Sequence, residues 1–356
     1  MSDDRRRAEL LRAALDRADP SELGDRTWAE WVTAARGDRV IPQLYALAGA
    51  QGGEAAVERF DLVTAMQLDV ACTAVRIEHA LVSVAHQLIA AEVPFAVLKG
   101  CATAHLDYRD PSQRQVGDVD LLVDPEDMSR VRGLLEGAGW HSAYQLPPHH
   151  DRFTHAITYR RQGIAEIDLH QHVAHRSLGL LIPTSELLAA RMPYQLAGQL
   201  LWALADGDRL IHACIHAVAS RGGYRRLSSL ADVLVMSEKQ AGSAREVLHR
   251  AEGWRVRSLA EQGIRQAWDA AMLELPDEWR SAMADPIRQR DRLVDRAYLG
   301  EKRRPAAEEL AHLRYLPTWR DRLLYLSGHV QMGSGPGGGG VIRRLRYLWS
   351  RLRQRD

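Results

Sequence analysis

A helical pattern of apolar and polar positions occupies the first part of the chain. Between residues 62 and 88, apolar and alanine residues recur at intervals of three and four, which is the spacing of one face of an α-helix. This stripe consists of Leu62, Met66, Val70, Ala74, Ile77, Leu81, Val84 and Leu88. We therefore expect an N-terminal helical region over residues 1–87.

The period changes after Pro94. The short apolar run 95–98 predicts a buried strand, with a short helix from Ala102 to Leu106 beyond Gly100. Residues 118–123 predict a second strand, ended by Asp124-Pro125, and a helix to about Glu136 that stops near Gly137 or Gly139. Strands over 153–160 and 164–170 flank Arg161-Gln162-Gly163, a hairpin signal. This order predicts the α+β class with a small mixed sheet over residues 88–175.

The C-terminal part is mostly helical from Pro183 to Leu326, so we treat residues 176–332 as one helical region. The clearest helical segments are 208–219, 227–237, 244–251 and 256–273. Residues 333–340 are glycine-rich and predict a linker. Residues 341–356 predict a basic amphipathic helix, which suits a membrane surface, a nucleic acid, an acidic partner or docking on its own protein.

Composition and charge leave an ordinary globular protein. Hydrophobic residues make up 46%, charged residues 26%, and the formal net charge is +1, so no overall field favours nucleic acid or membrane. Cys72, Cys101 and Cys214 are far apart in the sequence, which argues against a disulfide framework and a cysteine-rich zinc site. The N-terminus lacks a signal-peptide core, and no apolar run approaches the roughly 18 residues of a membrane span. We expect a cytoplasmic protein without a transmembrane segment.

The chemically informative residues are aspartates on predicted strands. Asp118 and Asp120 are two apart, so in a strand they project from the same face. Two close carboxylates repel each other unless a cation lies between them, and Mg²⁺ prefers oxygen ligands. Asp168, on the strand 164–170, is a candidate third ligand. In the alternative interpretation, Asp118 caps the strand and Asp120 forms a salt bridge.

Three motifs carry a resemblance to a known family. They are Leu98-Lys99-Gly100, the run from Arg114 through Gly117-Asp118-Val119-Asp120 to Val123, and Asp168-Leu169-His170. Together they resemble the bacterial uncharacterised nucleotidyltransferase family, a divergent branch of the DNA polymerase beta-like superfamily often found beside peptide natural-product biosynthesis genes. The resemblance extends over residues 88–232, where His212, His216, Arg226 and Asp232 echo the family pattern. It implies a small nucleotidyltransferase sheet embedded in a largely helical protein, with the acceptor on the side of residues 176–332.

The resemblance also implies a reaction. A nucleoside monophosphate would move from a nucleoside triphosphate, ATP by default, to a hydroxyl or phosphate acceptor, with release of pyrophosphate and two Mg²⁺ or Mn²⁺ ions. Asp118 and Asp120 would bind both metals, and Asp168 would bind the acceptor-side metal and could act as the base. A small-molecule or peptide acceptor is favoured, and a nucleic acid is possible. The alternatives are another phosphoryl transfer at the same site, or a non-catalytic nucleotide-binding or regulatory module.

Other residues are candidates for substrate contacts. Better-known superfamily members have a Gly-Ser turn after the first strand, whereas this chain has Lys99-Gly100, which could contact the triphosphate. The remaining candidates in this group are Arg114, Gly117 and His170. A zinc site of His170, His172 and His175 is not favoured. His212 and His216 are expected to pack or to line the pocket, and Asp232 to pair with Arg225, Arg226 or substrate.

Overall fold

The computed structural model describes residues 3–23, 28–50, 54–144, 153–219, 226–299 and 305–331. The predicted linker and tail helix (333–340 and 341–356) lie outside the described residues, as does Arg225. None of the described helices combines the length and the apolar character that crossing a membrane requires.

The described residues form a seven-stranded mixed sheet in the order β3-β4-β5-β2-β1-β7-β6. The strands are β1 (Phe95–Leu98), β2 (Val119–Val123), β3 (His141–Ser142), β4 (Ala156–Arg161), β5 (Ala165–His170), β6 (Met192–Leu196) and β7 (Gln199–Ala203). β2 pairs antiparallel with β1 and parallel with β5, and β4 pairs antiparallel with β5. The predicted strands and the hairpin around Gly163 are confirmed.

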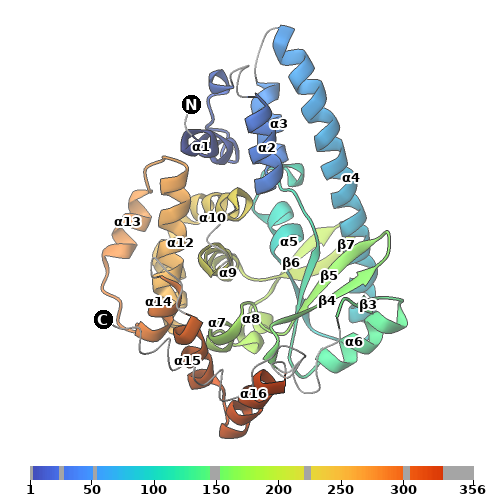
Figure 1. Cartoon of the computed structure of the whole chain (residues 1–356), viewed down its shortest axis with the longest axis vertical. Helices are drawn as coiled ribbons and strands as arrows, with labels where there is room; N and C mark the ends of the chain where they lie inside the picture. Colours follow the sequence, from blue (N-terminus) through green and yellow to red (C-terminus); the bar gives the residue numbers. More distant parts are fainter. Residues whose placement is uncertain are drawn as a thin grey trace.

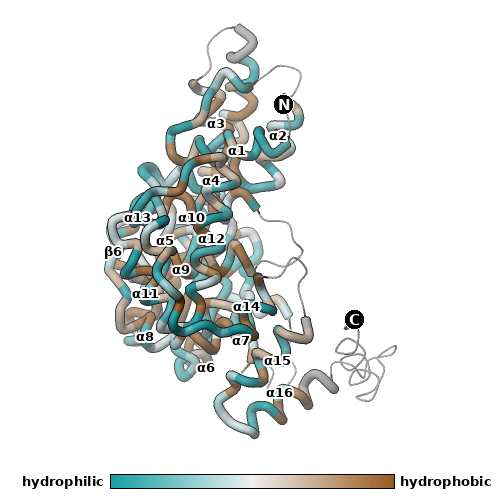
Figure 2. Tube along the Cα trace, turned by 90° about the vertical axis from the view of Figure 1, so that its left-hand side faces the viewer, coloured by the Kyte–Doolittle hydropathy of each residue, from teal (hydrophilic) through white to brown (hydrophobic). Residues whose placement is uncertain are grey.

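Helices surround this sheet (Figure 1). They are α1 (Asp3–Ala13), α2 (Trp28–Asp38), α3 (Ile41–Gly49), α4 (Glu54–Ala90), α5 (Lys99–Leu106), α6 (Met128–Gly137), α7 (Arg176–Leu181), α8 (Thr184–Ala189), α9 (Asp206–Ala219), α10 (Leu227–Lys239), α11 (Ala244–Gly253), α12 (Arg257–Ala270), α13 (Asp277–Ala284), α14 (Arg292–Tyr298), α15 (Pro305–Tyr315) and α16 (Trp319–Gln331). The α+β class and the largely helical surroundings of the sheet are therefore confirmed. Helices α1–α3 lie at one end of the long axis and α16 at the other (Figures 1 and 2).

The two faces of the sheet have different partners. On one face, alternate apolar residues such as Val97, Leu121 and Leu169 form a core with α4 and α6. The opposite face carries Asp120, Asp168 and His170, because alternate strand residues project to opposite sides. Ala96, Leu98 and Leu122 on this second face join a separate core made largely by α1–α3 and α7–α15. The polar residues therefore lie between the sheet and the helical region.

The apolar stripe of α4 is mostly buried from Val70 onward. Val70, Ile77 and Leu81 are buried, but Leu62 is 47% exposed. The first half of the helix instead packs on α3, where the rings of Tyr45 and Phe60 stack. The predicted stripe thus holds for the second half of the helix.

The sequence pattern does not predict the hairpin formed by β6 and β7, because it indicates mostly helix from Pro183 onward. It extends the sheet through a parallel pairing of Val97 in β1 with Ala203 in β7. The hairpin also leads directly into α9, since β7 ends three residues before Asp206. It therefore fixes where α9 crosses the polar face of the sheet.

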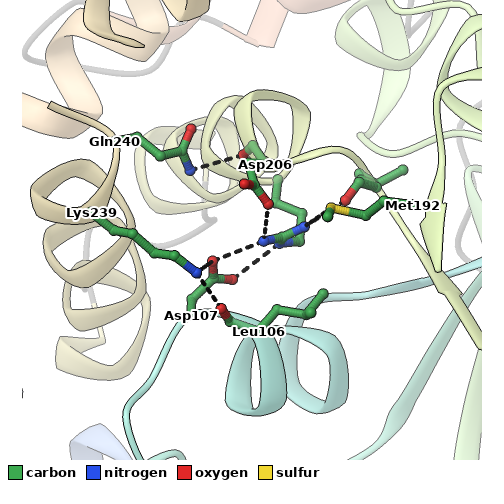
Figure 3. A network of polar contacts seen from close by, with 8 residues as sticks. Leu106, Asp107, Met192, Asp206, Lys239 and Gln240 are labelled. Carbon is green, nitrogen blue, oxygen red and sulfur yellow. Dashed lines mark hydrogen bonds and ion pairs between the residues drawn. The ribbon is translucent and has the colours of Figure 1, made fainter. Parts of the chain in front are cut away.

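A buried arginine ties these elements together. Arg209 of α9 donates hydrogen bonds to both carboxylate oxygens of Asp107, at 3.1 and 2.9 Å, and to Asp206 at 2.6 Å. It also donates to the carbonyl of Leu204, after β7, at 2.6 Å. Lys239 of α10 points into the same network (Figure 3). The end of α5 is thereby held against α9 and α10.

Candidate active site

Asp120 and Asp168 lie side by side on parallel strands. They are register partners in the pairing of β2 with β5, and His170 follows two residues after Asp168 on the same face. Ligand atoms of Asp120, Asp168 and His170 all lie within 4.8 Å of one another, the one such group found in the part of the chain that the structure describes. The structure thus brings together two of the three predicted metal ligands, with His170 beside them.

Asp120 is the most enclosed of these carboxylates. It is 4% exposed, and its Oδ1 accepts hydrogen bonds from Lys99 Nζ at 3.0 Å and His170 Nε2 at 2.7 Å. Burial alone would raise its pKa, but Lys99 and His170 outweigh burial and lower the pKa of Asp120. Because an ionised carboxylate only accepts, His170 carries its proton on Nε2. Asp120 is therefore ionised and held in place by two donors.

Asp118 lies immediately before β2, is half-buried, and stands outside the group formed by the other ligands. Burial and the negative charge of Asp120 raise the pKa of Asp118 to about 6, although Lys99 acts in the opposite direction. The carboxylates of the site thus carry more negative charge than the positive groups around them neutralise. This excess, together with the oxygen donors, fits a hard divalent cation.

Asp168 is oriented by its neighbour on β4. Thr158 Oγ1 donates to Asp168 Oδ1 at 2.6 Å, as expected for register partners on adjacent strands. Glu166 shares the face of Asp168 but lies nearer the exposed start of β5, where it forms an ion pair with its register partner Arg160. Asp168 is thus the carboxylate of β5 that faces the site.

Lys99 occupies the sharp turn between β1 and α5. Its φ of +41° lies in the left-handed region that non-glycine residues seldom adopt. Such strained residues concentrate at functional sites, and here the turn directs the ammonium group at Asp120. The neighbouring Gly100 is buried in α5, where a Cβ would lie 3.2 Å from Val116 Cγ1. Gly100 therefore lets the segment before β2 pack on α5, and its predicted phosphate contact stays a prediction.

Arg114 is engaged by a carboxylate from the helical region. Its Nε and Nη2 donate to the two oxygens of Asp232 at 2.7 and 2.8 Å, and Tyr108 OH donates to Asp232 at 3.0 Å. The sequence pointed to Arg225 or Arg226 as the partner of Asp232, whereas in the structure the partners are Arg114 and Tyr108. The pairing holds the segment before β2 against α10, and a phosphate contact by Arg114 stays a prediction.

The histidines divide between two places. Continued strand alternation would put His172 on the face of Asp168, but β5 ends at His170 and His172 lines a different cavity. His155, which sequence reasoning missed, lies edge-on to the ring of His170 with centroids 5.5 Å apart, and its ring packs against His175. Burial and the positive charges of His170 and His175 lower the pKa of His155 to about 2. Its position one residue before β4 gave no chemical signal in the sequence.

Asp168 opens into a cavity of about 400 Å³ between the sheet and the helices. Its lining includes Lys99, Asp168 and His170 from the sheet side, and Ile215, His216 and Tyr298 from the helices. A small cavity of about 30 Å³ next to Lys99 is lined by His212, His216, Arg114 and Asp232, among others. A third cavity of about 490 Å³ shares His155 and Arg176 with the first. His212, His216 and Asp232 thus all line a cavity beside Lys99.

A small mixed sheet with a Gly-Asp-x-Asp motif at the start of one strand, and a further aspartate on its parallel neighbour, is the arrangement of a nucleotidyltransferase. The family model described as uncharacterised nucleotidyltransferase matches residues 24–269, more than half of the chain. The chain therefore belongs to the uncharacterised nucleotidyltransferase family. The match starts well before the region 88–232 on which the sequence resemblance rested.

The chain is similar to solved structures. One of them is the crystal structure of an antigenic nucleotidyltransferase-like protein from Paracoccidioides brasiliensis, with 16% sequence identity and a TM-score of 0.37. The similarity covers 56% of this chain and 94% of the other. A comparison with curated proteins finds no match.

Proposed function

We propose that this protein transfers a nucleoside monophosphate from a nucleoside triphosphate to a hydroxyl or phosphate acceptor, with Asp118, Asp120 and Asp168 as ligands of Mg²⁺ or Mn²⁺. The observation that supports this most is the pairing of Asp120 with Asp168 on parallel strands. Membership of the nucleotidyltransferase family supports the reaction class.

Each residue of the site has a distinct part in this proposal. A bound divalent ion would lower the pKa of the acceptor hydroxyl and offset charge on the departing pyrophosphate. Asp168 has one oxygen occupied by Thr158, which leaves the other for a metal or for the acceptor proton. His170 orients Asp120 through its Nε2 proton. Lys99 supplies a positive charge beside Asp120, and in this proposal its ammonium group contacts the triphosphate.

The cavity supports a small acceptor. A volume of about 400 Å³ lies within the range typical of small-molecule sites, and the carboxylate-bearing strand β5 opens into it. We therefore favour a small molecule or a peptide natural product over a nucleic acid, with ATP as the default donor. The mass of the product would separate nucleotidyl transfer from another phosphoryl transfer, because a transferred nucleotide adds a nucleoside to the acceptor.

The experiment is a calorimetric titration of ATP and GTP, each with Mg²⁺, into wild type and Asp118→Asn/Asp120→Asn. We expect metal-dependent binding to wild type and at least a tenfold loss in the double variant, since charged ligands contribute about 1.5–3 kcal/mol each. Asp61→Asn/Asp69→Asn is the control, because both of its aspartates are exposed on α4 and the change in net charge is the same. Equal binding by wild type and the active-site variant would show that the metal assignment is wrong.

A further inference from the structure

Arg39, from the N-terminal helices, contacts the metal-binding motif. It lies in the turn between α2 and α3, far from the motif in sequence. A Cβ built on Gly117 would lie 2.9 Å from Arg39 Nη1 and 3.6 Å from its Cζ. The guanidinium therefore rests on the backbone of Gly117, the residue just before Asp118. A side chain at position 117 would occupy the space that this guanidinium fills.

The backbone of Arg39 is strained and well anchored. Its φ is +57°, a left-handed conformation that costs a non-glycine residue on the order of 1 kcal/mol. The preceding Asp38 is fully buried, accepting a hydrogen bond from the backbone of Leu227 at 3.0 Å and one from Arg7 at 2.9 Å. On the other side, Gln43 donates to the carbonyl of Gln113 at 2.8 Å. These contacts hold the turn in place and preserve the strained conformation.

No side chain among the described residues pairs with the guanidinium group of Arg39. Arg39 is exposed, and within the described ranges its side chain has no recorded ion pair or hydrogen bond. By contrast, the guanidinium group of Arg114 is hydrogen-bonded to the carboxylate of Asp232. Arg39 nevertheless lies close enough to Asp118 for its positive charge to act on that carboxylate. An arginine held beside a metal ligand without pairing with it has its donors directed toward solvent or an incoming anion.

The position of Arg39 relative to the carboxylates indicates which anion it would bind. The nucleophile and the leaving group lie roughly in line on opposite sides of the transferred phosphorus. Asp168 lines the cavity of about 400 Å³, and neither Asp118 nor Arg39 does. If the acceptor enters through that cavity, the leaving pyrophosphate lies at the other end of the site, beside Asp118.

We propose that Arg39 is a phosphate-binding residue, whose guanidinium contacts the two outer phosphates of the nucleoside triphosphate and the pyrophosphate that leaves. This inference rests on the proposed function and extends it to a residue outside the sheet. A fixed guanidinium stabilises charge that develops on the leaving group, and its fork geometry suits phosphate oxygens. The N-terminal helices thereby contribute directly to the site.

The first test measures binding of pyrophosphate with Mg²⁺, and of AMP, to Arg39→Gln and Arg39→Lys by calorimetry. We expect Arg39→Gln to bind pyrophosphate about 10- to 100-fold more weakly and to bind AMP as wild type does. Arg39→Lys should lie between them, because a lysine keeps the charge but loses the fork. Arg36→Gln, an exposed arginine in the last turn of the preceding helix α2, is the matched control and should bind as wild type.

A purely electrostatic role for Arg39 gives an opposite readout. If Arg39 merely balanced Asp118, then its removal would leave the carboxylates more negative and tighten the binding of Mn²⁺ alone. Tighter Mn²⁺ binding by Arg39→Gln with unchanged pyrophosphate affinity would overturn the inference. Weaker pyrophosphate binding with Mn²⁺ affinity unchanged or increased supports it.

Gly117→Ala tests the same contact without removing the arginine. The backbone of Gly117 is outside the left-handed region and the nearest atom is the end of a flexible side chain, so the fold should tolerate alanine while the guanidinium moves. We expect pyrophosphate binding to weaken as in Arg39→Gln, and the double variant to be no worse than the poorer single variant. Additive losses would show that Gly117 and Arg39 act separately and would overturn the inference.

These outcomes separate the two proposals. If binding of Mg²⁺-ATP and pyrophosphate is lost in Asp118→Asn/Asp120→Asn but unchanged in Arg39→Gln, the proposed function stands and the role of Arg39 is wrong. If wild type binds neither ligand with Mg²⁺, the proposed function fails and the role of Arg39 fails with it.

Discussion

Asp118 carries a charge that its surroundings do not balance, and this has a measurable consequence without metal. Its pKa is raised to about 6 by burial and by Asp120, so at pH 7.5 its ionisation destabilises the folded state. We expect Asp118→Asn to raise the free energy of unfolding in EDTA by about 1–3 kcal/mol, measured by urea denaturation. Asp69→Asn on the exposed face of α4 is the control.

Adding Mg²⁺ should reverse the order of the two proteins. The ion stabilises the folded wild type by binding it preferentially, whereas the variant lacks one of the proposed ligands. A variant that gains as much stability from Mg²⁺ as wild type does would contradict the placement of a metal at Asp118.

Because of His212, we expect the free energy of unfolding to fall in acid. It is buried, and burial together with the positive charge of Lys99 lowers its pKa well below the usual value, with His216 and His170 acting in the same direction and Asp120 in the other. Below about pH 6.5, His212 is therefore protonated in the unfolded chain but stays neutral in the folded protein. The free energy of unfolding falls as the pH drops through this range. The slope is about 1.4 kcal/mol per pH unit for each such histidine.

We expect His212→Gln to reduce this slope by about one proton between pH 6.5 and 5. The measurement is the urea unfolding free energy at several pH values, and comparing slopes removes any constant effect of the substitution. His249→Gln, an exposed histidine of α11, should keep the wild-type slope. An unchanged slope in His212→Gln would mean that this histidine titrates normally in the folded protein.

Individual site residues differ in how far the sequence identified them. Asp118, Asp120 and Asp168 could be proposed as ligands from the sequence because strand alternation and a local motif are properties of short segments, and the structure brings Asp120 and Asp168 together. The pairing of Arg114 with Asp232, the position of His155 and the contact of Arg39 with Gly117 depend on segments far apart in the chain. A single sequence contains no periodicity that reports such contacts.

The helices and strands show the same division. The helices α9, α10, α11 and α12 begin and end within three residues of the predicted segments, because one-sided burial produces a 3.6-residue period. The hairpin of β6 and β7 was missed because its turn is Ala197-Gly198, with φ values of +49° and +79°. Turns with two positive φ values usually carry Asn-Gly or Asp-Gly, and alanine at the first position hides the signal.

This turn gives a test in which a glycine should stabilise. Alanine in the left-handed region is strained, so Ala197→Gly should raise the free energy of unfolding by about 0.5–1 kcal/mol despite the entropy that glycine loses on folding. The opposite change is expected for Ala65→Gly at an exposed position in the interior of α4, where glycine costs about 1 kcal/mol. Thermal unfolding of both variants checks the pair, and a destabilised Ala197→Gly would show that the turn conformation is wrong.

The site is enclosed by helices and strands that are far apart in the sequence. Helices α1–α3 share a core with α9–α13, although the intervening α4 and sheet separate them along the chain. Tyr298 and Glu308 line the cavity beside Asp168. Both residues lie beyond residue 269, where the match to the family model ends. The region matched by the family model therefore supplies the carboxylates, and helices beyond it contribute to the same cavity.

The network around Arg209 is where these parts are joined, so breaking it should destabilise the protein as a whole. Arg209→Met leaves the buried carboxylate of Asp107 and the carbonyl of Leu204 without their main donor, and only Lys239, 3.9 Å away, remains near Asp107. Removing one partner of a buried pair costs about 3–5 kcal/mol. We expect a loss of this size in urea denaturation, with a single cooperative transition, because α5, α9 and α10 are held by the same group.

The matched control is Arg280→Met, which removes an arginine from an exposed pair with Asp277. Such pairs contribute at most about 1 kcal/mol, so this variant should unfold close to wild type. If Arg209→Met were equally mild, the network would contribute little, and hydrophobic contacts alone would hold the helical region on the sheet. If Arg209→Met instead unfolded in two steps, the sheet and the helices would be separately stable, and Arg209 would serve to orient α9 over the carboxylates.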